Sequence, residues 1–360
     1  MGIASENKIV AVIGAAGHTG RFVVAELKRR ALGVIVVGRD ERKLTPEAAS
    51  PDVTLRAARM DDPASLDAAV AGAAAVINCA GPFMDTAIPV IDAALRAGIP
   101  YLDVAAEQQT VQAIIATRDA AARHAGVVLL PAAAFYGGLA DLLASAVHDG
   151  SEPVDEVTVA MFLDSWHPTS GTRVTGKRNT AKRLMQRQGR LEVIPDPAPT
   201  RHWNFPAPFG DQDMVMLPLT EMITLAHHLR PDTIDSWINL APLRDLRDPA
   251  TPPPKASDAQ GRSAQLFVMD VLVRKGDQVR RATASGQDIY AVTAPIIVEA
   301  LERLLAGEAR DKAGVRSLGD AFDARAFLDA LGPDTVRVVY QDAVQPSPER
   351  GACRPGEWQG

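Results

Sequence analysis

The chain has 360 residues, of which 47% are hydrophobic and 23% charged, an ordinary globular composition with material for two domains. The net charge is −6 without a basic block, and no run approaches about 20 uninterrupted apolar residues, so we expect neither a nucleic-acid nor a membrane partner. Two distant cysteines allow no disulfide framework and no metal-ligand spacing, and the first residues hold no apolar signal region. We therefore expect a cytoplasmic protein without a metal site.

The first predicted elements are a strand, a glycine-rich turn and a helix, in the order that a dinucleotide-binding site requires. An apolar run, residues 9–13, leads into three glycines spaced three apart, and an amphipathic segment follows them. Gly14 would permit the turn, Gly17 would let the backbone approach a pyrophosphate, and Gly20 would let the helix pack close to the strand. We predict cofactor contacts at Gly14, Ala16, Gly17, His18, Thr19 and Gly20.

Strands and helices then alternate as far as residue 130, and the strands are continuous apolar runs. That pattern is typical of a parallel sheet covered on both faces. It predicts a doubly wound Rossmann domain over residues 1–135. The further strands are expected at 34–37, 53–58, 74–79, 101–104 and 127–130, and the helices at 63–70, 86–97 and 107–125.

The pattern changes after residue 131, where alternating apolar and polar residues replace the continuous apolar runs. These features predict a second, α+β domain over residues 136–344, built on a mainly antiparallel sheet and used for substrate binding and dimerisation. Its last helix is expected to return to the Rossmann half, and residues 345–360 are expected to be disordered. The clearest elements are a helix at 139–147, strands at 154–163 and 236–242, a hairpin at 264–286 and the last helix at 289–306.

Arg39 directly follows the second strand. NAD-selective folds tend to carry an acidic residue there, whereas an arginine suits the 2′-phosphate of NADP. Arg42 and Lys43 add positive charge nearby, while Asp40 stands one residue beyond the expected position. A solvated arginine at a strand end is the alternative interpretation. We predict NADP(H) as the cofactor, in preference to NAD(H).

A second cofactor segment ends the fourth strand, at the sheet edge where ligands of doubly wound proteins bind. Its small residues would let the cofactor lie against the backbone, and its proline fixes the exit of the chain. We predict contacts at Asn78, Cys79, Ala80, Gly81 and Pro82. Cys79 is more simply interpreted as a small buried residue than as a nucleophile, because no histidine stands at a supporting spacing.

Several segments together resemble the saccharopine dehydrogenase-like oxidoreductases, which have an NADP-binding Rossmann domain. They are GAAGHTGR (14–21), GRDERKL (38–44), INCAGPF (77–83), IDAALRAGIPYLDVAAEQ (91–108) and GGLADLL (137–143). The resemblance covers residues 8–145 and returns faintly at 285–305, and it implies an NADP-dependent oxidoreductase. Many members carry glycine where Ala106 and Ala133-Ala134 stand. Both places lie near where nicotinamide and substrate should meet, so the substrate is not implied.

Two candidate catalytic residues, Glu107 and Tyr136, follow strands at the ligand-binding edge of the predicted parallel sheet. Glu107 could act in the site. Alternatively, it could only cap or precede the next helix, whose N-terminus favours a carboxylate. Its neighbour Gln108 could contact the nicotinamide amide. The Tyr136 phenol could donate a proton to a developing oxyanion or amine, or could only pack or touch the cofactor. Position 140 is alanine, so the Tyr-x-x-x-Lys dyad of short-chain dehydrogenases is absent.

The densest polar cluster outside the Rossmann region follows the strand expected at 154–163. His167 in this cluster is slightly favoured over Tyr136 as the proton donor, because an imidazole has a pKa of ~6.5, close to neutrality. The cations of this cluster, Arg173, Lys177 or Arg178, could hold a carboxylate, a phosphate or a carrier group. A solvated loop with a structural tryptophan is the alternative. Substrate contacts are predicted at Asp164, Trp166, Arg173, Lys177 and Arg178.

These features support two hypotheses about function. In the first, a homodimeric enzyme transfers hydride between NADP(H) and a C=N, C=O or activated C=C bond of a small-molecule substrate, with His167, Tyr136 and Glu107 as catalytic candidates. In the second, an NmrA-like dinucleotide-binding sensor uses cofactor occupancy to regulate a partner without catalysis. The substantial second domain with its polar cluster favours the enzyme. Neither the substrate nor the direction of hydride transfer follows from the sequence.

Overall fold

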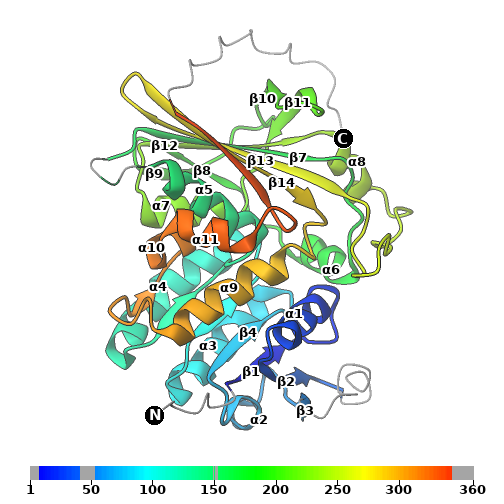
Figure 1. The fold of residues 1–360 in the computed structure, drawn as a ribbon, viewed down its shortest axis with the longest axis vertical. Coiled ribbons are helices and arrows are strands. Elements are labelled where there is room, and N and C mark those ends of the chain that lie inside the picture. The colour runs from blue at the N-terminus through cyan, green and yellow to red at the C-terminus, as the bar shows by residue number, and fades with distance from the viewer. Residues whose placement is uncertain (1–7, 41–52, 149, 151–152, 343–360) are drawn as a thin grey trace.

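The computed structural model describes residues 8–40, 53–148, 150 and 153–342. It consists of two sheets placed one above the other along the longest axis of the molecule, with helices on and between them (Figure 1). The predicted cations Arg42 and Lys43 and the tail 345–360 lie outside the described residues.

The N-terminal half is built on sheet A, in which seven strands are all parallel. Without its outermost strand, β15, the spatial order is the 3-2-1-4-5-6 order of Rossmann folds. Ile13, the last residue of β1, lies beside Val37 and Asn78, so three strand ends come together at one edge. In spatial order the strands are β15 (Gly314–Val315), β6 (Val128–Leu130), β5 (Tyr101–Asp103), β4 (Ala75–Asn78), β1 (Ile9–Ile13), β2 (Gly33–Gly38) and β3 (Val53–Ala57).

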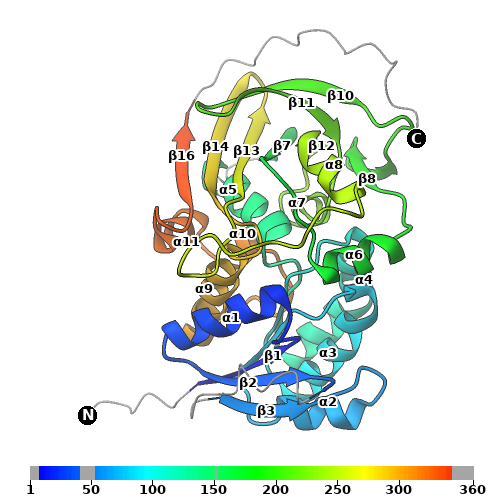
Figure 2. The same ribbon diagram turned by 90° about the vertical axis from the view of Figure 1, so that its right-hand side faces the viewer.

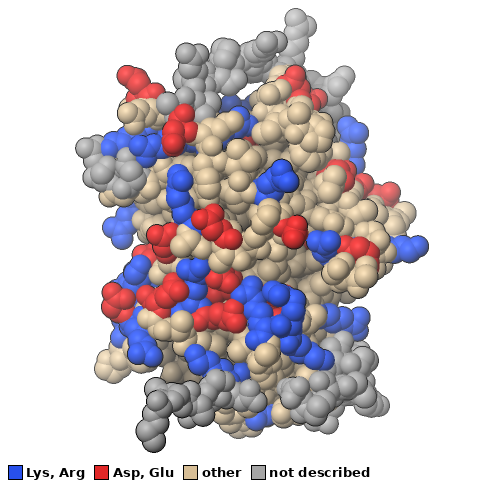
Figure 3. All heavy atoms as spheres, viewed as in Figure 1, with Lys and Arg blue, Asp and Glu red and all other residues tan. Residues whose placement is uncertain are grey.

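Helices cover both faces of sheet A (Figure 2). One face carries α1 (His18–Arg29) and α9 (Thr293–Ala306), and the other carries α2 (Pro63–Val70), α3 (Phe83–Ala97) and α4 (Gln108–Ala125). Figure 3 shows Lys and Arg side chains gathered over α1 and Asp and Glu side chains over the neighbouring α9. Arg30, just after α1, forms ion pairs with Glu299 at 2.7 Å and Glu302 at 2.5 Å, which join these two helices.

The C-terminal half is built on sheet B, which has nine strands. Its strand pairs are antiparallel except for β7 with β12 among those described. The main path in spatial order is β10 (Thr200–Phe205), β11 (Gly210–Met216), β12 (Thr233–Asn239), β7 (Glu156–Leu163), β13 (Leu266–Lys275), β14 (Gln278–Gln287) and β16 (Arg337–Gln341); β8 (Leu184–Arg187) pairs with β12 and with β9 (Arg190–Val193).

The remaining helices connect the sheets or lie against sheet B. Besides the π-helical segment η2 (Phe135–Leu139), they are α5 (Ala140–Val147), α6 (Ser170–Arg178), α7 (Glu221–His228), α8 (Ala241–Arg247), α10 (Leu318–Ala321) and α11 (Ala324–Leu331). The predicted fold class, a Rossmann half with an α+β half on a mainly antiparallel sheet, is confirmed. The strand expected at 236–242 is partly wrong, because β12 ends at Asn239 and Pro242 stands in the first turn of α8, where proline is favoured.

One hydrophobic core runs through both halves. Buried residues of α1, such as Val23 and Leu27, belong to the same cluster as Ile297 of α9 and Met269 of sheet B. The core under α2, α3 and α4 forms a second cluster. The two sheets are therefore held together by shared packing as well as by the connecting chain. The division at residues 135 and 136 stays a prediction.

Candidate active site

A pocket of about 1450 Å³ runs along the carboxyl ends of β1, β2 and β4 and continues beneath α6. Small-molecule sites usually measure about 300–1000 Å³, so this pocket has room for a dinucleotide and a second molecule. Ligands of open α/β sheets bind at this edge. The pocket therefore lies where the sequence predicted the cofactor.

The glycine-rich turn has the geometry that a pyrophosphate site requires. Gly14 has a φ of +78°, and a Cβ there would come within 2.9 Å of Ala80 Cα. A Cβ on Gly20 would come within 2.3 Å of the Gly14 carbonyl oxygen, so glycine is needed for the close packing of α1. Gly17 directly precedes α1 as its N-cap and offers no side-chain cap, which leaves N–H groups open for an anion. Gly14, Gly17, His18 and Thr19 line the pocket, whereas Ala16 and Gly20 do not.

Arg39 is exposed and lines the far end of the pocket, beyond β2. The next strand, β3, ends beside it, because the Ala58 N–H donates to the Gly38 carbonyl at 3.1 Å. Arg59 follows there, lines the same pocket and forms an exposed ion pair with Asp61 at 2.8 Å. Sequence reasoning missed Arg59, although a basic residue soon after the third strand was a usable signal.

The segment after β4 shapes the middle of the pocket. Cys79, Ala80, Gly81 and Pro82 line it, but Asn78 does not. Asn78 is fully buried; its Oδ1 accepts from the Ala80 N–H at 3.0 Å and its Nδ2 donates to Thr86 Oγ1 at 3.2 Å. Asn78 therefore holds the turn in place. Burial raises the pKa of the Cys79 thiol to about 12, which does not suit a nucleophile at neutral pH.

Glu107 lines the pocket but is only 3% exposed. Its two carboxylate oxygens accept from the Phe83 N–H at 3.1 Å and the Ala106 N–H at 3.0 Å. Burial raises the pKa of Glu107, and these two N–H groups act in the opposite direction. The carboxylate thus joins the loop after β5 to the start of α3. Gln108, suggested for the nicotinamide amide, instead bonds the backbone of Leu184 and is not part of the pocket wall.

Tyr136, in η2, lines the pocket on the side of sheet B. Its hydroxyl is buried and has no hydrogen-bond partner among the described residues. Its ring lies 6.1 Å from that of Trp166. Burial raises the pKa of Tyr136 well above its ordinary value, the charges of Tyr290 and Glu221 raise it further, and the nearby cation Arg183 opposes them.

Two charged residues that the sequence analysis missed stand close to Tyr136. Arg183 immediately precedes β8 and lines the pocket, and burial lowers its pKa. Glu221 begins α7 and is fully buried; its Oε1 accepts from the Leu219 N–H at 2.7 Å and Ser236 Oγ at 2.5 Å, while its Oε2 has no partner among the described residues. Arg183 lies in a segment whose structure the sequence left unassigned, so no pattern pointed to it.

The polar cluster after β7 divides between the pocket and the surface. Trp166, Arg173, Lys177 and Arg178 line the pocket, whereas Asp164 and His167 do not. Asp164 is exposed and accepts from the Leu266 N–H at 3.0 Å. His167 is half-buried.

Several groups in this cluster are already engaged by protein partners. Arg173 donates to the carbonyls of Asp248 and Thr251, and Arg178 pairs with Asp85. Trp166 donates to the hydroxyl of Tyr290 at 3.1 Å. These contacts tie α6 and its neighbours across the pocket mouth.

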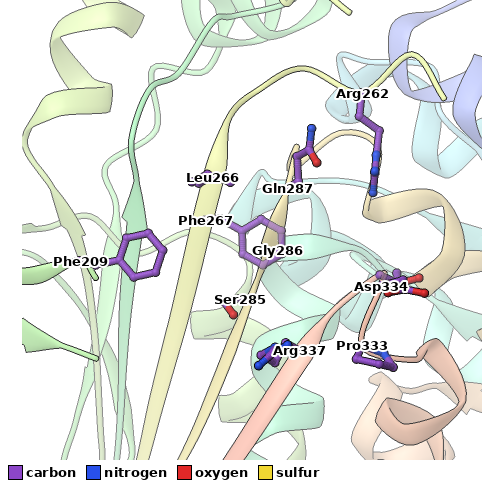
Figure 4. A pocket seen from close by; sticks show the side chains of 11 residues that line it. Phe209, Arg262, Leu266, Phe267, Ser285, Gly286, Gln287, Pro333, Asp334 and Arg337 are labelled. Atoms are coloured by element: carbon purple, nitrogen blue, oxygen red, sulfur yellow. The ribbon is translucent and has the colours of Figure 1, made fainter. Parts of the chain in front are cut away.

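A smaller depression of about 330 Å³ lies on sheet B and shares no residue with the large pocket. Phe267 of β13 and Gln287 of β14 lie on one side of it, and Asp334 and Arg337 near the start of β16 lie on the other (Figure 4). In the parts of the chain that the structure describes, no group of three or more His, Cys, Asp or Glu could hold a metal ion. The helices described there include none long and apolar enough to cross a membrane.

The fold and the pocket define a dinucleotide-binding protein of the Rossmann type with a second α+β half. Residues 10–130 match the family described as the saccharopine dehydrogenase NADP binding domain, which confirms NADP(H) as the predicted cofactor of this region. Saccharopine dehydrogenase-like oxidoreductases from human and mouse are 31% and 29% identical to the chain over 150 aligned residues. A relative from Arabidopsis thaliana named "probable mitochondrial saccharopine dehydrogenase-like oxidoreductase" is 30% identical over 144 residues.

The alignments with these relatives span about a third of this chain and about a third of each relative. The alignment covers 36% of this chain and 35% of the human protein, and 34% and 31% for the plant protein. A solved structure extends the likeness to both halves: apo saccharopine dehydrogenase (L-Glu forming) from Saccharomyces cerevisiae has a TM-score of 0.66 and 13% identity, and covers 94% of this chain and all of that one. At that identity the likeness concerns the fold alone. The family match and the aligned relatives confirm the predicted resemblance to saccharopine dehydrogenase-like oxidoreductases.

Proposed function

We propose that the protein is an NADP(H)-dependent oxidoreductase that transfers hydride to or from a C=N, C=O or activated C=C bond of a small molecule. One observation carries the proposal: a single pocket joins the glycine turn and Arg39 at one end to Tyr136, Trp166 and Arg183 at the other. Its size leaves space for a substrate beside the cofactor. A site used only to sense a dinucleotide would not need that second compartment.

The residues present fit the cofactor. Open N–H groups at the start of α1 suit the pyrophosphate, and Arg39, with Arg59 beside it, suits the 2′-phosphate. Ala80 and Gly81 leave room against the backbone after β4. When bound, the cofactor supplies or accepts the hydride, while the protein orients both reactants and excludes water.

Reduction of C=N or C=O leaves a nitrogen or oxygen that needs a proton, and Tyr136 is placed better than His167 to provide it. Tyr136 lines the pocket and His167 does not. Burial raises the pKa of Tyr136 most and the nearby cation Arg183 only partly opposes it, so the phenol keeps its proton until a more basic alkoxide or amine anion develops beside it. The buried, unpartnered Tyr136 hydroxyl is a costly arrangement that a ligand atom would relieve. Glu107, with both oxygens engaged, acts by shaping the pocket wall.

The decisive experiment follows the hydride itself. NADPH carrying deuterium at the transferable C4 position is incubated with the protein and a panel of imines, ketones and activated alkenes, and the products are examined by mass spectrometry. We expect deuterium in one product with the parent protein and none with the Gly17→Val variant, in which the pyrophosphate site is blocked. Tight NADPH binding without deuterium transfer to any member of the panel would instead favour the NmrA-like sensor.

Other expectations remain predictions. The homodimer and the division of the chain into a cofactor domain (1–135) and a substrate domain (136–344) belong to this proposal. A cytoplasmic location is also part of it, although one plant relative is named as mitochondrial. Sedimentation analysis and localisation of a tagged chain would test them.

A further inference from the structure

Arg183 is a cation in the pocket wall that the protein itself leaves without an anionic partner. Its guanidinium donates to the Pro218 carbonyl at 3.1 Å, and it forms no ion pair with any residue that the structure describes. Burial lowers its pKa, which reports the cost of keeping this charge away from water. Arg183 is half-buried. Charges withdrawn from water are normally paired, so an unpaired guanidinium that borders a pocket indicates an anion from outside.

A buried acid close to Arg183 does not pair with it. Glu221 influences the pKa of Arg183, yet its Oε1 accepts from Leu219 and Ser236, and its Oε2 bonds none of the described residues, Arg183 included. Glu221 also stands behind the pocket wall rather than in it. The planar guanidinium can bind a carboxylate through two parallel hydrogen bonds. The other candidate cations differ from Arg183, since Arg173 and Arg178 already have protein partners and Lys177 is exposed to solvent.

The surface next to Arg183 is apolar and aromatic. The rings of Tyr136 and Trp166 lie 6.1 Å apart at 34°, and Leu219, next to the Pro218 carbonyl that Arg183 contacts, is only 5% exposed. Tyr290 closes this side through its hydrogen bond with Trp166. Aromatic walls of this kind favour an apolar or aromatic ligand body.

The wall offers no spare carboxylate for an ammonium group. Three acidic residues line the described pocket, and each is already engaged: Asp61 by Arg59, Asp85 by Arg178, and Glu107 by two backbone N–H groups. A ligand ammonium would lose its hydration without gaining a charged acceptor. The same pocket would accept the ligand without that group.

We propose that the substrate compartment takes an amphipathic carboxylate: an apolar or aromatic body against Tyr136 and Trp166, its carboxylate on Arg183, and no ammonium group. This inference rests on the proposed function, because it assigns the second compartment of the same pocket. It separates this chain from an enzyme for a zwitterionic amino acid, which would need an acidic side chain in the wall.

Calorimetric titration of the NADP⁺-saturated protein with three related probes tests the proposal. Phenylacetate has the proposed chemistry, phenylacetamide lacks the charge, and phenylalanine adds an ammonium group. We expect phenylacetate to bind at least about tenfold more tightly than either of the others, since hydrogen bonds between charged groups contribute that much or more. Equal affinity for phenylacetate and phenylacetamide, tighter binding of phenylalanine, or no binding of any probe would overturn the proposal.

Variants locate the carboxylate site. Arg183→Gln should weaken phenylacetate binding at least about tenfold and remove its advantage over phenylacetamide, whereas Arg190→Gln, an exposed arginine on β9, should change nothing. Should Arg183→Gln fail to fold by circular dichroism, Arg183→Lys keeps the charge without the planar fork and should still lose affinity. Parental affinity in a folded Arg183 variant would refute the site. NADP⁺ binding is measured first on each sample. A parent sample that binds NADP⁺ but not phenylacetate contradicts the carboxylate site, whereas a parent sample that does not bind NADP⁺ contradicts the proposed function.

Discussion

The side-chain amide of Gln108 forms two hydrogen bonds with the backbone of Leu184, one in each direction. Its Oε1 accepts from the Leu184 N–H at 2.8 Å, and its Nε2 donates to the Leu184 carbonyl at 3.0 Å. Gln108 begins α4 of the cofactor half and Leu184 begins β8 of the other half. Arg183 is the residue before Leu184. A side chain from the cofactor half therefore positions the cation that we assign to the substrate.

Removing this contact should loosen the junction between the halves. Gln108 is only 6% exposed, so Gln108→Ala leaves polar backbone groups of Leu184 without their partner. We expect the free energy of unfolding to fall by about 1–3 kcal/mol. Urea denaturation measures it, and Gln109→Ala, an exposed neighbour on the same helix, is the matched control. Equal midpoints for the two variants would contradict this account.

Cofactor selectivity should depend on Arg39. Arg39→Ala should weaken NADPH binding by about 1.5–3 kcal/mol and leave NADH binding almost unchanged, because only NADPH carries the 2′-phosphate. Arg59→Ala should have a smaller effect, since Arg59 is partly neutralised by Asp61. Calorimetric titration with both cofactors provides the comparison. Equal affinities of the parent protein for NADPH and NADH would end this assignment.

Substitutions of the glycines in the turn should have different effects, one on stability and the other on cofactor binding. Gly20→Ala places a Cβ 2.3 Å from the Gly14 carbonyl oxygen, so we expect the melting temperature to fall. Gly17 is exposed, and a Cβ there would lie 3.1 Å from the same oxygen, so Gly17→Val should leave a folded protein that no longer binds NADPH. Thermal denaturation and cofactor fluorescence separate the two effects. A folded Gly17→Val variant with parental NADPH affinity would move the pyrophosphate elsewhere.

The proton donor can be tested once a substrate is known. Tyr136→Phe should lower turnover about 10²–10⁴-fold with NADPH binding preserved, whereas His167→Ala should remain near the parent, because His167 does not line the pocket. Steady-state kinetics across a range of pH distinguishes the two. An inactive His167→Ala with a near-parental Tyr136→Phe would make His167 the proton donor. Near-parental turnover in both variants would indicate water or another residue as the donor.

Stability should decrease as pH rises through the titration of His228. Its Nδ1 lies 3.0 Å from Oδ1 of the fully buried Asp141. Burial alone lowers the pKa of His228, but the Asp141 carboxylate outweighs burial and the pKa is raised. A raised pKa means that protonated His228 stabilises the fold fully below the unfolded pKa of ~6.5, and that this contribution is lost as pH rises through the folded pKa.

Urea denaturation at several pH values checks this dependence. Between the unfolded and the folded pKa of His228, the free energy of unfolding should decline less in His228→Gln than in the parent. The full decline should be retained in His124→Gln, whose histidine is exposed on α4. A parental slope in His228→Gln would show that other groups cause the decline.

The sequence predicted sheet A well because its strands are continuous apolar runs between recognisable helix boundaries. β1 and α2 have the predicted bounds, and the helices α3 and α4 end at glycines in the left-handed conformation. The parts that were missed are short: β15 has two residues, and the exposed strand β9 has four. Their structure depends on neighbours that are distant in sequence.

The candidate site was predictable only where one short segment carries it. The glycine turn and Arg39 lie within one strand–helix–strand unit, so spacing alone indicated their use. Arg183 and Glu221 come from separate elements and approach Tyr136 only in the folded chain. Pairing of β8 with β12 and the start of α7 beneath sheet B create that neighbourhood. No local pattern encodes it.

The return of the chain to sheet A affects how this protein could be dissected. β15 hydrogen-bonds to the outer strand β6, and α9 covers one face of the sheet, yet both lie beyond residue 290. A fragment that stopped near residue 135 would expose the β6 edge and the apolar surface beneath α9, which favours aggregation. A cofactor-binding module transplanted from this chain would therefore have to be assembled from two separate stretches, joined by a new linker in place of sheet B.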